Sequence, residues 1–121
     1  MATTIMKNAA ADSAEAYYKA MNDKDANGMA EHLHPDVCLV TPMEQLTGKT
    51  AVLEAATRLM RFVQSVSVHA KFGTEDEAML TYNMDFGEQI GVCRAAAWMK
   101  FKDALIVRNE IFFDPRPFAR G

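Results

Sequence analysis

Tyr17, Glu44, Tyr82 and Asn109 are the side chains of this 121-residue chain best suited to handle a small polar group. A tyrosine hydroxyl donates a hydrogen bond, an asparagine amide both donates and accepts, and a glutamate carboxylate takes up a proton. Glu44 lies in the polar segment "TPMEQLTG", three residues after Thr41. Whether these groups act together depends on the helices and strands that carry them.

His32 and His34 have a spacing seen at some metal sites, yet residues i and i+2 at a helix end do not share a face. Neither a nearby cysteine nor a third histidine completes a tetrahedral set, and the dipole at a helix C-terminus favours a cationic histidine. The chain also contains no glycine-rich phosphate loop, nucleophile elbow or zinc-binding cysteine cluster. We therefore expect neither a metal nor a cofactor.

The bulk composition narrows the class of protein. With 50% hydrophobic and 24% charged residues, the chain suits one compact domain spanning residues 1–121, and we expect residues 1–11 to form a flexible N-terminal segment. The net charge is -3, and the 13 lysines and arginines are scattered among 16 acidic residues instead of forming a stripe. This distribution argues against nucleic acid as a partner.

Hydropathy and cysteine content bear on the compartment. The longest apolar run is only a few residues, far below the roughly 20 that span a bilayer, and the N-terminus has no apolar signal core. We therefore expect no membrane contact and a cytoplasmic location. Cys38 and Cys93 show no disulfide-framework spacing, so we expect free thiols packed in apolar strands.

Apolar residues recur at helical spacing in three segments of the first half of the chain. The first helix is predicted to begin at Asp12 and to run for about 11 residues. Its apolar side consists of Ala14, Tyr17, Tyr18 and Met21. A short second helix begins at a cap on Asp25 and ends at Pro35; its apolar residues are Met29, Ala30 and Leu33. The third helix has its apolar positions at Val52, Leu53, Ala56, Leu59, Met60 and Val63.

The remaining segments have the composition of β-strands. "DVCLVT" (36–41) is short and β-branched, and predicts a first strand before the third helix. Four longer strands follow, at 65–72, 77–86, 91–101 and 104–113, with connections short enough for hairpins. Helices followed by a run of strands indicate an α+β fold with an antiparallel sheet that packs one face on the helices. The last residues, "DPRPFARG", are expected to leave the sheet as a tail across its edge.

The order of these elements, with "NDKDANGMAEHLHPDV", "LTGKTAV" and "FFDPRPF", resembles the nuclear transport factor 2-like superfamily. Within it, the chain is similar to the SnoaL-like and ketosteroid-isomerase-like branch. The resemblance covers nearly the whole chain and implies a cystatin-like cone, a strongly curved antiparallel sheet packed on three N-terminal helices. It also implies an apolar pocket inside the cone and a homodimer formed through the other face of the sheet.

Strand alternation divides the side chains between the two faces, because successive residues point in opposite directions. Matching "AAAWMKF" and "IFFD" to the late strands of the family places these residues inside the cone: Cys93, Ala95, Ala97, Met99, Phe101, Val107, Asn109, Ile111 and Phe113, with Leu80, Tyr82, Met84, Val37, Leu39 and Thr41 from earlier strands. The outer face then carries Arg94 and Trp98, a combination of charge and aromatic surface that suits the implied dimer interface.

The ketosteroid-isomerase layout uses a carboxylate base, a helix tyrosine and a protonated aspartate. Of these positions, only the tyrosine is kept, as Tyr17, while Thr41 and Ala97 stand at the other two. We therefore do not expect that mechanism in its usual layout. Glu44 is the remaining candidate for the general base, and the alternative is a solvent-exposed loop acid. The Asn109 amide needs a ligand, an ordered water or an internal bond to Tyr82.

These expectations combine into a small-molecule-binding domain whose apolar pocket is lined by Tyr17, Thr41, Leu80, Tyr82, Met84, Met99, Asn109 and Phe113. The resemblance implies isomerase, cyclase, dehydratase or hydrolase chemistry on a carbonyl-bearing or polycyclic compound. Tyr17 would polarise an oxygen and Glu44 would move the proton. The alternative is a non-catalytic interaction or accessory module that recruits its partner through Trp98 and the outer sheet face.

Overall fold

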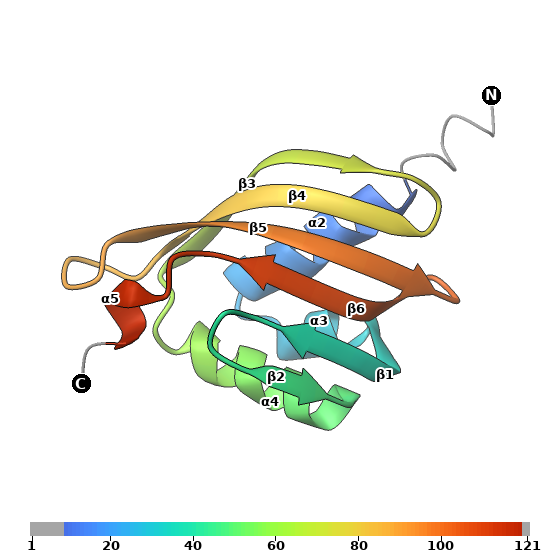
Figure 1. Ribbon diagram of the computed structural model, residues 1–121, viewed down its shortest axis with the longest axis horizontal. Helices are drawn as coiled ribbons and strands as arrows, with labels where there is room; N and C mark the ends of the chain where they lie inside the picture. The colour runs from blue at the N-terminus through green and yellow to red at the C-terminus, as the bar shows by residue number, and fades with distance from the viewer. Residues whose placement is uncertain (1–8, 120–121) are drawn as a thin grey trace.

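The computed structural model describes residues 9–119. Its elements, in chain order, are α2 (Ala9–Asn22), α3 (Ala26–Ala30), β1 (Leu33–Val40), β2 (Gln45–Thr47), α4 (Lys49–Met60), β3 (Ser65–Gly73), β4 (Glu77–Asp85), β5 (Val92–Lys102), β6 (Leu105–Phe112) and α5 (Arg116–Ala119) (Figure 1). The strands form a six-stranded sheet in the order β2-β1-β6-β5-β4-β3.

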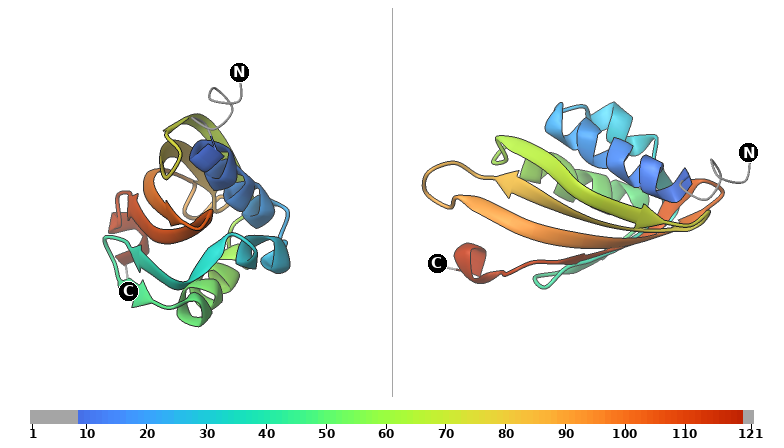
Figure 2. Two further views of the ribbon diagram at one scale, coloured as in Figure 1. Left: turned by 90° about the vertical axis from the view of Figure 1, so that its right-hand side faces the viewer. Right: turned by 90° about the horizontal axis from the view of Figure 1, so that it is seen from above.

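The sheet curves, and helices α2, α3 and α4 lie on one of its two sides (Figure 2). The predicted α+β fold with helices packed against a curved sheet is thus confirmed. One pairing differs from the prediction, because β1 runs parallel to β6 while the other neighbours are antiparallel. No hairpin constrains β1 against β6, since the whole remaining domain connects them, and a parallel pairing is therefore open to them.

The four long strands β3 to β6 form the predicted meander, with ends within one residue of the predicted ones. The turn between β5 and β6 consists of Asp103 and Ala104, whose φ angles are 55° and 65°. Positive φ at both central residues is the signature of a type I′ turn, whose twist matches that of the flanking strands. Local sequence therefore sets the order and direction of these four strands.

The N-terminal half departs from the prediction in several places. Helix α2 begins at Ala9, and the buried side chains of Ala10 and Ala11 belong to the core; the predicted flexible segment otherwise falls on residues outside the described range. The second helix begins after the predicted cap, Asp25, but stops at Ala30. Leu33 already belongs to β1, and Pro35 lies within that strand.

Pairing explains why β1 tolerates a proline. The register of β1 on β6 shifts between Leu33 and Cys38, so Pro35 sits at an irregularity where a missing N–H breaks no regular ladder. The segment after β1 also hides a short strand, β2, whose three residues pair with residues 38–40. Three residues are too few for alternation to be recognised in the sequence.

Alternation places most inward residues correctly, but a bulge in β6 changes one of them. Lys100 pairs with Arg108 and Phe101 with Ile106, so Val107 is an extra residue without a partner across the strand. Ile106 is fully buried and takes the inward place predicted for Val107. A bulge shifts alternation by one residue, and this accounts for the error.

Lys24 connects the end of α2 to the end of α4. Its backbone is in the left-handed region, with φ of 60°. Its ammonium group donates hydrogen bonds to the carbonyl oxygen of Met60, at 2.8 Å, and to that of Val63. Met60 is the last residue of α4, where carbonyls lack helical partners and the dipole favours a cation. Lys24 therefore holds two of the helices in place.

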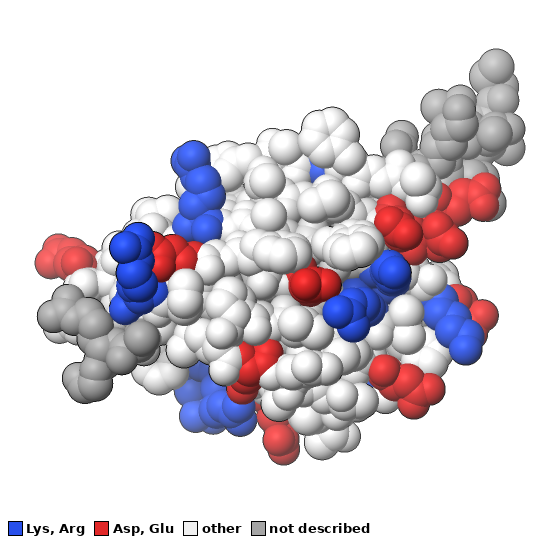
Figure 3. Space-filling model, in the orientation of Figure 1, with Lys and Arg blue, Asp and Glu red and all other residues white. Residues whose placement is uncertain are grey.

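The outer face of the sheet carries exposed apolar side chains. Phe72, 74% exposed, pairs with Met79, and Phe112 is 49% exposed on β6. Figure 3 shows this face, and its surface over β3, β4 and β5 is largely uncharged. Arg94 and Trp98 lie here as predicted, since they alternate with the buried residues of β5. No helix in the described part of the chain is long and apolar enough to cross a membrane.

Candidate functional site

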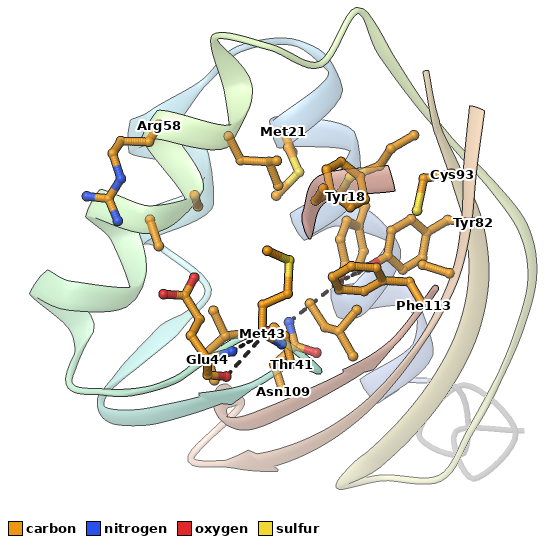
Figure 4. Close-up of a pocket in the computed structure, with 18 of the residues that line it drawn as sticks. Tyr18, Met21, Thr41, Met43, Glu44, Arg58, Tyr82, Cys93, Asn109 and Phe113 are labelled. Carbon is orange, nitrogen blue, oxygen red and sulfur yellow. Dashed lines mark hydrogen bonds between the residues drawn. The ribbon is translucent and has the colours of Figure 1, made fainter. Parts of the chain in front are cut away.

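A cavity of about 470 Å³ lies between the concave face of the sheet and helices α2 and α4 (Figure 4). The lining is mostly aliphatic, aromatic and methionine side chains: Met21, Leu39, Met43, Val52, Leu59, Met84, Ile111, Phe113 and Phe118 are among them. They meet because a helix repeats one face every three to four residues and a strand repeats one every two. The cavity is therefore a product of the same periodicities that the sequence displays.

Two tyrosines and one asparagine form a polar cluster at the floor of this cavity. The hydroxyl of Tyr18 donates to the hydroxyl of Tyr82 at 3.1 Å, and Nδ2 of Asn109 donates to the hydroxyl of Tyr18 at 3.5 Å. The rings of Tyr18 and Tyr82 also stack, with centroids 4.2 Å apart. The three residues come from α2, β4 and β6, so only the assembled fold creates the cluster.

The amide oxygen of Asn109 is the exception in this cluster. The residue is only 4% exposed, and its Oδ1 is the one buried side-chain nitrogen or oxygen atom in residues 9–119 that lacks a hydrogen-bond partner. Leaving a buried carbonyl unpaired costs about 1–3 kcal/mol. The floor of the cavity thus contains a hydrogen-bond acceptor with nothing to accept from.

Burial controls the ionisation of the tyrosines. Desolvation raises the pKa of Tyr82 well above its usual value, with further contributions from Tyr18 and Tyr17. Desolvation also raises the pKa of Tyr18, although its hydrogen bonds with Tyr82 and Asn109 oppose the shift. The pKa of Tyr17 rises for the same main reason, burial, with a smaller contribution from Tyr18. All three phenols therefore stay neutral and act as hydrogen-bond donors rather than as bases.

Thr41 organises the loop at the mouth of the cavity. Its Oγ1 accepts hydrogen bonds from the backbone N–H groups of Met43 and Glu44, both at 3.1 Å. The backbone N–H of Thr41 donates to the carbonyl oxygen of Glu44 at 2.9 Å, which closes the turn. The threonine that stands in place of a catalytic carboxylate therefore has a structural use, since it presents Met43 and Glu44 to the cavity.

Two charged side chains, Glu44 and Arg58, form the rim. Both line the cavity and both are exposed, and they lie at the opposite end from the tyrosine cluster (Figure 4). Neither takes part in an ion pair among the described residues. Within residues 9–119, no group of histidine, cysteine or acidic side chains is arranged to hold a metal ion. The cavity therefore has a neutral polar floor, an apolar wall and a charged rim.

Most residues predicted for the pocket line this cavity: Tyr17, Thr41, Tyr82, Met84, Asn109 and Phe113, and Glu44, the candidate base, lines it too. The prediction was wrong for Leu80 and Met99, which point to the same side of the sheet but belong to the closed core. Leu80 comes before the cavity-lining residues of β4, and Met99 comes after those of β5, so both lie toward the same end of the antiparallel pair. At this end the small residues Ala10, Ala11 and Ala14 let α2 approach the sheet. The cavity therefore occupies only one end of the concave face.

The sequence did not reveal which tyrosine reaches the asparagine. Tyr17 and Tyr18 are adjacent and both buried, but Tyr18 forms the bonds to Tyr82 and Asn109. Tyr82 and Asn109 do not bond to each other directly, because the Tyr18 hydroxyl lies between them. Arg58 and Phe118 also line the cavity without having been predicted there, while Cys93 lines it as its predicted place inside the cone implies. The helical spacing of apolar residues places both tyrosines on the buried side of α2, and it does not tell which of them contacts Asn109.

Comparison with known proteins gives one family match and several solved structures with a similar fold. The family model of the SnoaL-like domain matches residues 14–109. A Kribbella flavida DSM 17836 protein is 25% identical, with a TM-score of 0.86 and 92% of this chain and 91% of that chain covered. An LEH-like epoxide hydrolase of M. tuberculosis is 15% identical, with a TM-score of 0.76 and coverage of 92% and 86%. A steroid delta-isomerase of Pseudomonas aeruginosa is 20% identical, with a TM-score of 0.72 and coverage of 88% and 80%. No curated protein matches the chain.

Proposed function

This chain belongs to the SnoaL-like domain family, and from that premise we propose that it binds a small, largely apolar organic molecule in the cavity beneath α2 and α4. The observation that carries the proposal is the cavity itself, about 470 Å³ in volume, with an apolar wall and a few polar groups at its floor. Pockets for drug-sized organic molecules have volumes of about 300–1,000 Å³ and the same kind of lining. An apolar molecule of that size gains free energy by leaving water for such a wall.

The similar structures support the same class of ligand. The epoxide hydrolase and the steroid delta-isomerase share the fold and are named for reactions on small organic molecules. At 15% and 20% identity, their likeness extends to the fold alone. For this chain they support an organic ligand, while the chemistry must come from its own residues.

Proton transfer is the chemistry that these residues can perform. Glu44 at the rim is the available proton acceptor, and the neutral hydroxyl of Tyr17 in the cavity is an available donor. A carboxylate base and a phenol donor suit an isomerase, cyclase or hydrolase that acts on a carbonyl-bearing or polycyclic compound. A Glu44→Gln variant keeps the shape of the side chain and removes the base. We expect it to retain binding and to lose any turnover.

A thermal-shift screen with steroids, polyketide-like aromatics and small enones tests the binding proposal, since a ligand that binds the folded state raises the melting temperature. Ala55 lines the cavity from α4, while Glu54 is exposed on the same helix. Ala55→Trp fills the cavity and should abolish the shift; Glu54→Trp should preserve it. Absence of any shift with the wild-type protein, or a shift unaffected by Ala55→Trp, would refute ligand binding in this cavity.

A second candidate function is self-association through the outer face of the sheet. The exposed Phe72, Met79 and Phe112 lie on this face. Trp98 is half-buried beside them, with its Nε1 donating to Glu77 at 3.2 Å and the Lys100 ammonium 5.0 Å from the centre of its ring. The face carries both basic and acidic residues, so two copies related by a twofold axis can bring opposite charges together. We propose a homodimer through this face.

Sedimentation equilibrium measures this association directly. Replacing Phe72 with Asp places a charge on the apolar surface and should give a monomer, because a buried unpaired charge is costly. Phe62→Asp, also on an exposed phenylalanine but after α4, is the matched control and should leave the association unchanged. A wild-type protein that sediments as a monomer at 100 μM would exclude this second function.

A further inference from the structure

The unpaired amide oxygen of Asn109 specifies the ligand more closely than the shape of the cavity does. We propose that the cavity takes an apolar molecule carrying a neutral hydroxyl group, an alcohol or a phenol, whose O–H donates to Asn109 Oδ1. This inference rests on the proposed function, because it assumes that the cavity binds an organic molecule. It adds the polar group that this molecule presents to the cavity floor.

The direction of the hydrogen bonds in the floor leads to this assignment. Asn109 donates through one N–H of Nδ2 to Tyr18, and Tyr18 donates to Tyr82. The amide oxygen at the start of this series of hydrogen bonds, Asn109 Oδ1, has no partner among the described residues. A buried acceptor is satisfied only by a donor, and a carbonyl or ether oxygen of a ligand has none. The required group is therefore a donor.

Access to this oxygen needs only a small adjustment. Asn109 lines the cavity although its Oδ1 is buried. The terminal torsion of an asparagine side chain has a broad energy profile, so a modest rotation turns the oxygen toward the cavity. Leu39 pairs with Asn109 across β1 and β6, and both Leu39 and Ile111 line the cavity beside it. A ligand at the floor can thus reach the amide oxygen.

Charge excludes two other polar groups, an ammonium and a carboxylate. The phenols of Tyr18 and Tyr82 are neutral, because burial raises the pKa of each, and no charged side chain belongs to the floor cluster. An ammonium group would be buried there without a counter-charge, which is far more costly than burying a hydroxyl. A carboxylate would place negative charge beside the amide oxygen. In Figure 4 the side chains of Glu44 and Arg58 lie on the side of the cavity away from Tyr18 and Tyr82.

The oxygen of a hydroxyl group distinguishes it from a neutral N–H donor, because this oxygen can also accept a hydrogen bond. Tyr18 supplies the hydrogen in its bond with Tyr82, so the hydrogen of the Tyr82 hydroxyl is left for another acceptor. A hydroxyl oxygen accepts as well as donates, while an indole or pyrrole N–H only donates. A ligand hydroxyl therefore matches both open sites of the cluster in type, one acceptor on Asn109 and one donor on Tyr82.

Three probes with one ring system test this inference. 2-Naphthol donates and accepts, 2-methoxynaphthalene only accepts, and naphthalene does neither, while all three fill a similar apolar volume. Dissociation constants are measured by calorimetry on the full chain at pH 7. We expect 2-naphthol to bind about tenfold more tightly than the ether, which corresponds to one net hydrogen bond. Naphthalene, which neither donates nor accepts, should bind no more tightly than the ether.

Variants locate the effect. Asn109→Leu keeps the branched shape of the side chain without the amide, and should abolish the preference for 2-naphthol while leaving naphthalene binding intact. Asn83→Leu makes the same replacement on the outer side of β4, where the Asn83 oxygen accepts from Arg94 at 3.4 Å, and should leave the preference unchanged. Circular dichroism confirms folding, and the wild-type comparison of the three probes stands even without the first variant.

The outcomes separate the inference from the proposed function. Equal affinities for 2-naphthol and its ether, or a preference that persists in Asn109→Leu, would overturn the hydroxyl assignment while leaving an apolar-ligand site in place. Failure of all three probes and of the wider screen would refute the cavity as a ligand site, and the hydroxyl assignment with it. Tight 2-naphthol binding that depends on Asn109 would support both.

Discussion

Replacing Asn109 with leucine should stabilise the ligand-free protein, although the residue is buried and hydrogen-bonded. The substitution removes an unpaired buried acceptor, which costs the folded state about 1–3 kcal/mol. It also removes the bond from Nδ2 to Tyr18, whose length of 3.5 Å puts it at the limit of hydrogen bonding and well below an average contribution. Leucine branches at the same carbon as asparagine and has the same number of side-chain heavy atoms, so no cavity is created, and the partly open space beside the residue takes up its larger methyl groups.

The net expectation is a gain of about 1–2 kcal/mol in the free energy of unfolding, from the relieved acceptor less the weak bond. For a chain of this length, that gain corresponds to a rise of roughly 4–8 °C in the melting temperature. Urea unfolding followed by circular dichroism measures the free energy, and an unchanged slope with denaturant shows that the folded state is equally compact. The protein should be free of ligand during the measurement.

Asn83→Leu is the matched control, because Asn83 is partly exposed and its oxygen accepts from Arg94. Surface changes of this kind fall within about 0.5 kcal/mol of zero. Destabilisation of Asn109→Leu by 1 kcal/mol or more would refute the reasoning, since it would mean that the amide contributes more to the fold than its open oxygen costs. A stabilised variant that no longer prefers 2-naphthol would show that this asparagine is kept for binding at the expense of stability.

Three further predictions follow from the contacts around the cavity. Thr41→Val should destabilise the folded protein by about 1 kcal/mol and speed hydrogen exchange at Met43 and Glu44, because both N–H groups lose their acceptor; Thr47→Val, at an exposed threonine of β2, should do neither. Lys24→Met should lower the free energy of unfolding in urea by about 1–2 kcal/mol, because its bonds to Met60 and Val63 are lost. The control Lys19→Met, at an exposed lysine, should lower it by less than about 0.5 kcal/mol, and equal effects would contradict the capping role of Lys24. Because burial raises the pKa of all three tyrosines, their contribution to stability is complete below the unfolded pKa of about 10 and declines as pH rises above it. Phenolate absorbance at 295 nm should therefore appear together with unfolding in an alkaline titration, and phenolate formed while the protein is still folded would contradict this burial.

Sequence patterns predicted the parts of the fold that depend on local periodicity. Apolar residues at helical spacing located α2 and α4, and alternation located β3 to β6, because each pattern follows from the geometry of a single element. The same alternation put Tyr82 and Asn109 on the concave side. Tyr82 lies in the regular pairing of β4 with β5, and Asn109 lies in the regular part of β6 that follows the bulge. The family resemblance supplied the curved sheet and the pocket, and the family is confirmed.

The tertiary structure decided what depends on pairing between distant segments. The bulge in β6 moved Ile106 into the place predicted for Val107, and the close approach of α2 excluded Leu80 and Met99 from the cavity. Packing also selected Tyr18 over Tyr17 as the bridge between Tyr82 and Asn109. These outcomes depend on how far elements approach and where registers shift, and no pattern within one segment contains that information. The sequence thus determined which side of the sheet most of these side chains face, and only packing determined which of them line the cavity and that one buried amide oxygen is left without a partner in residues 9–119.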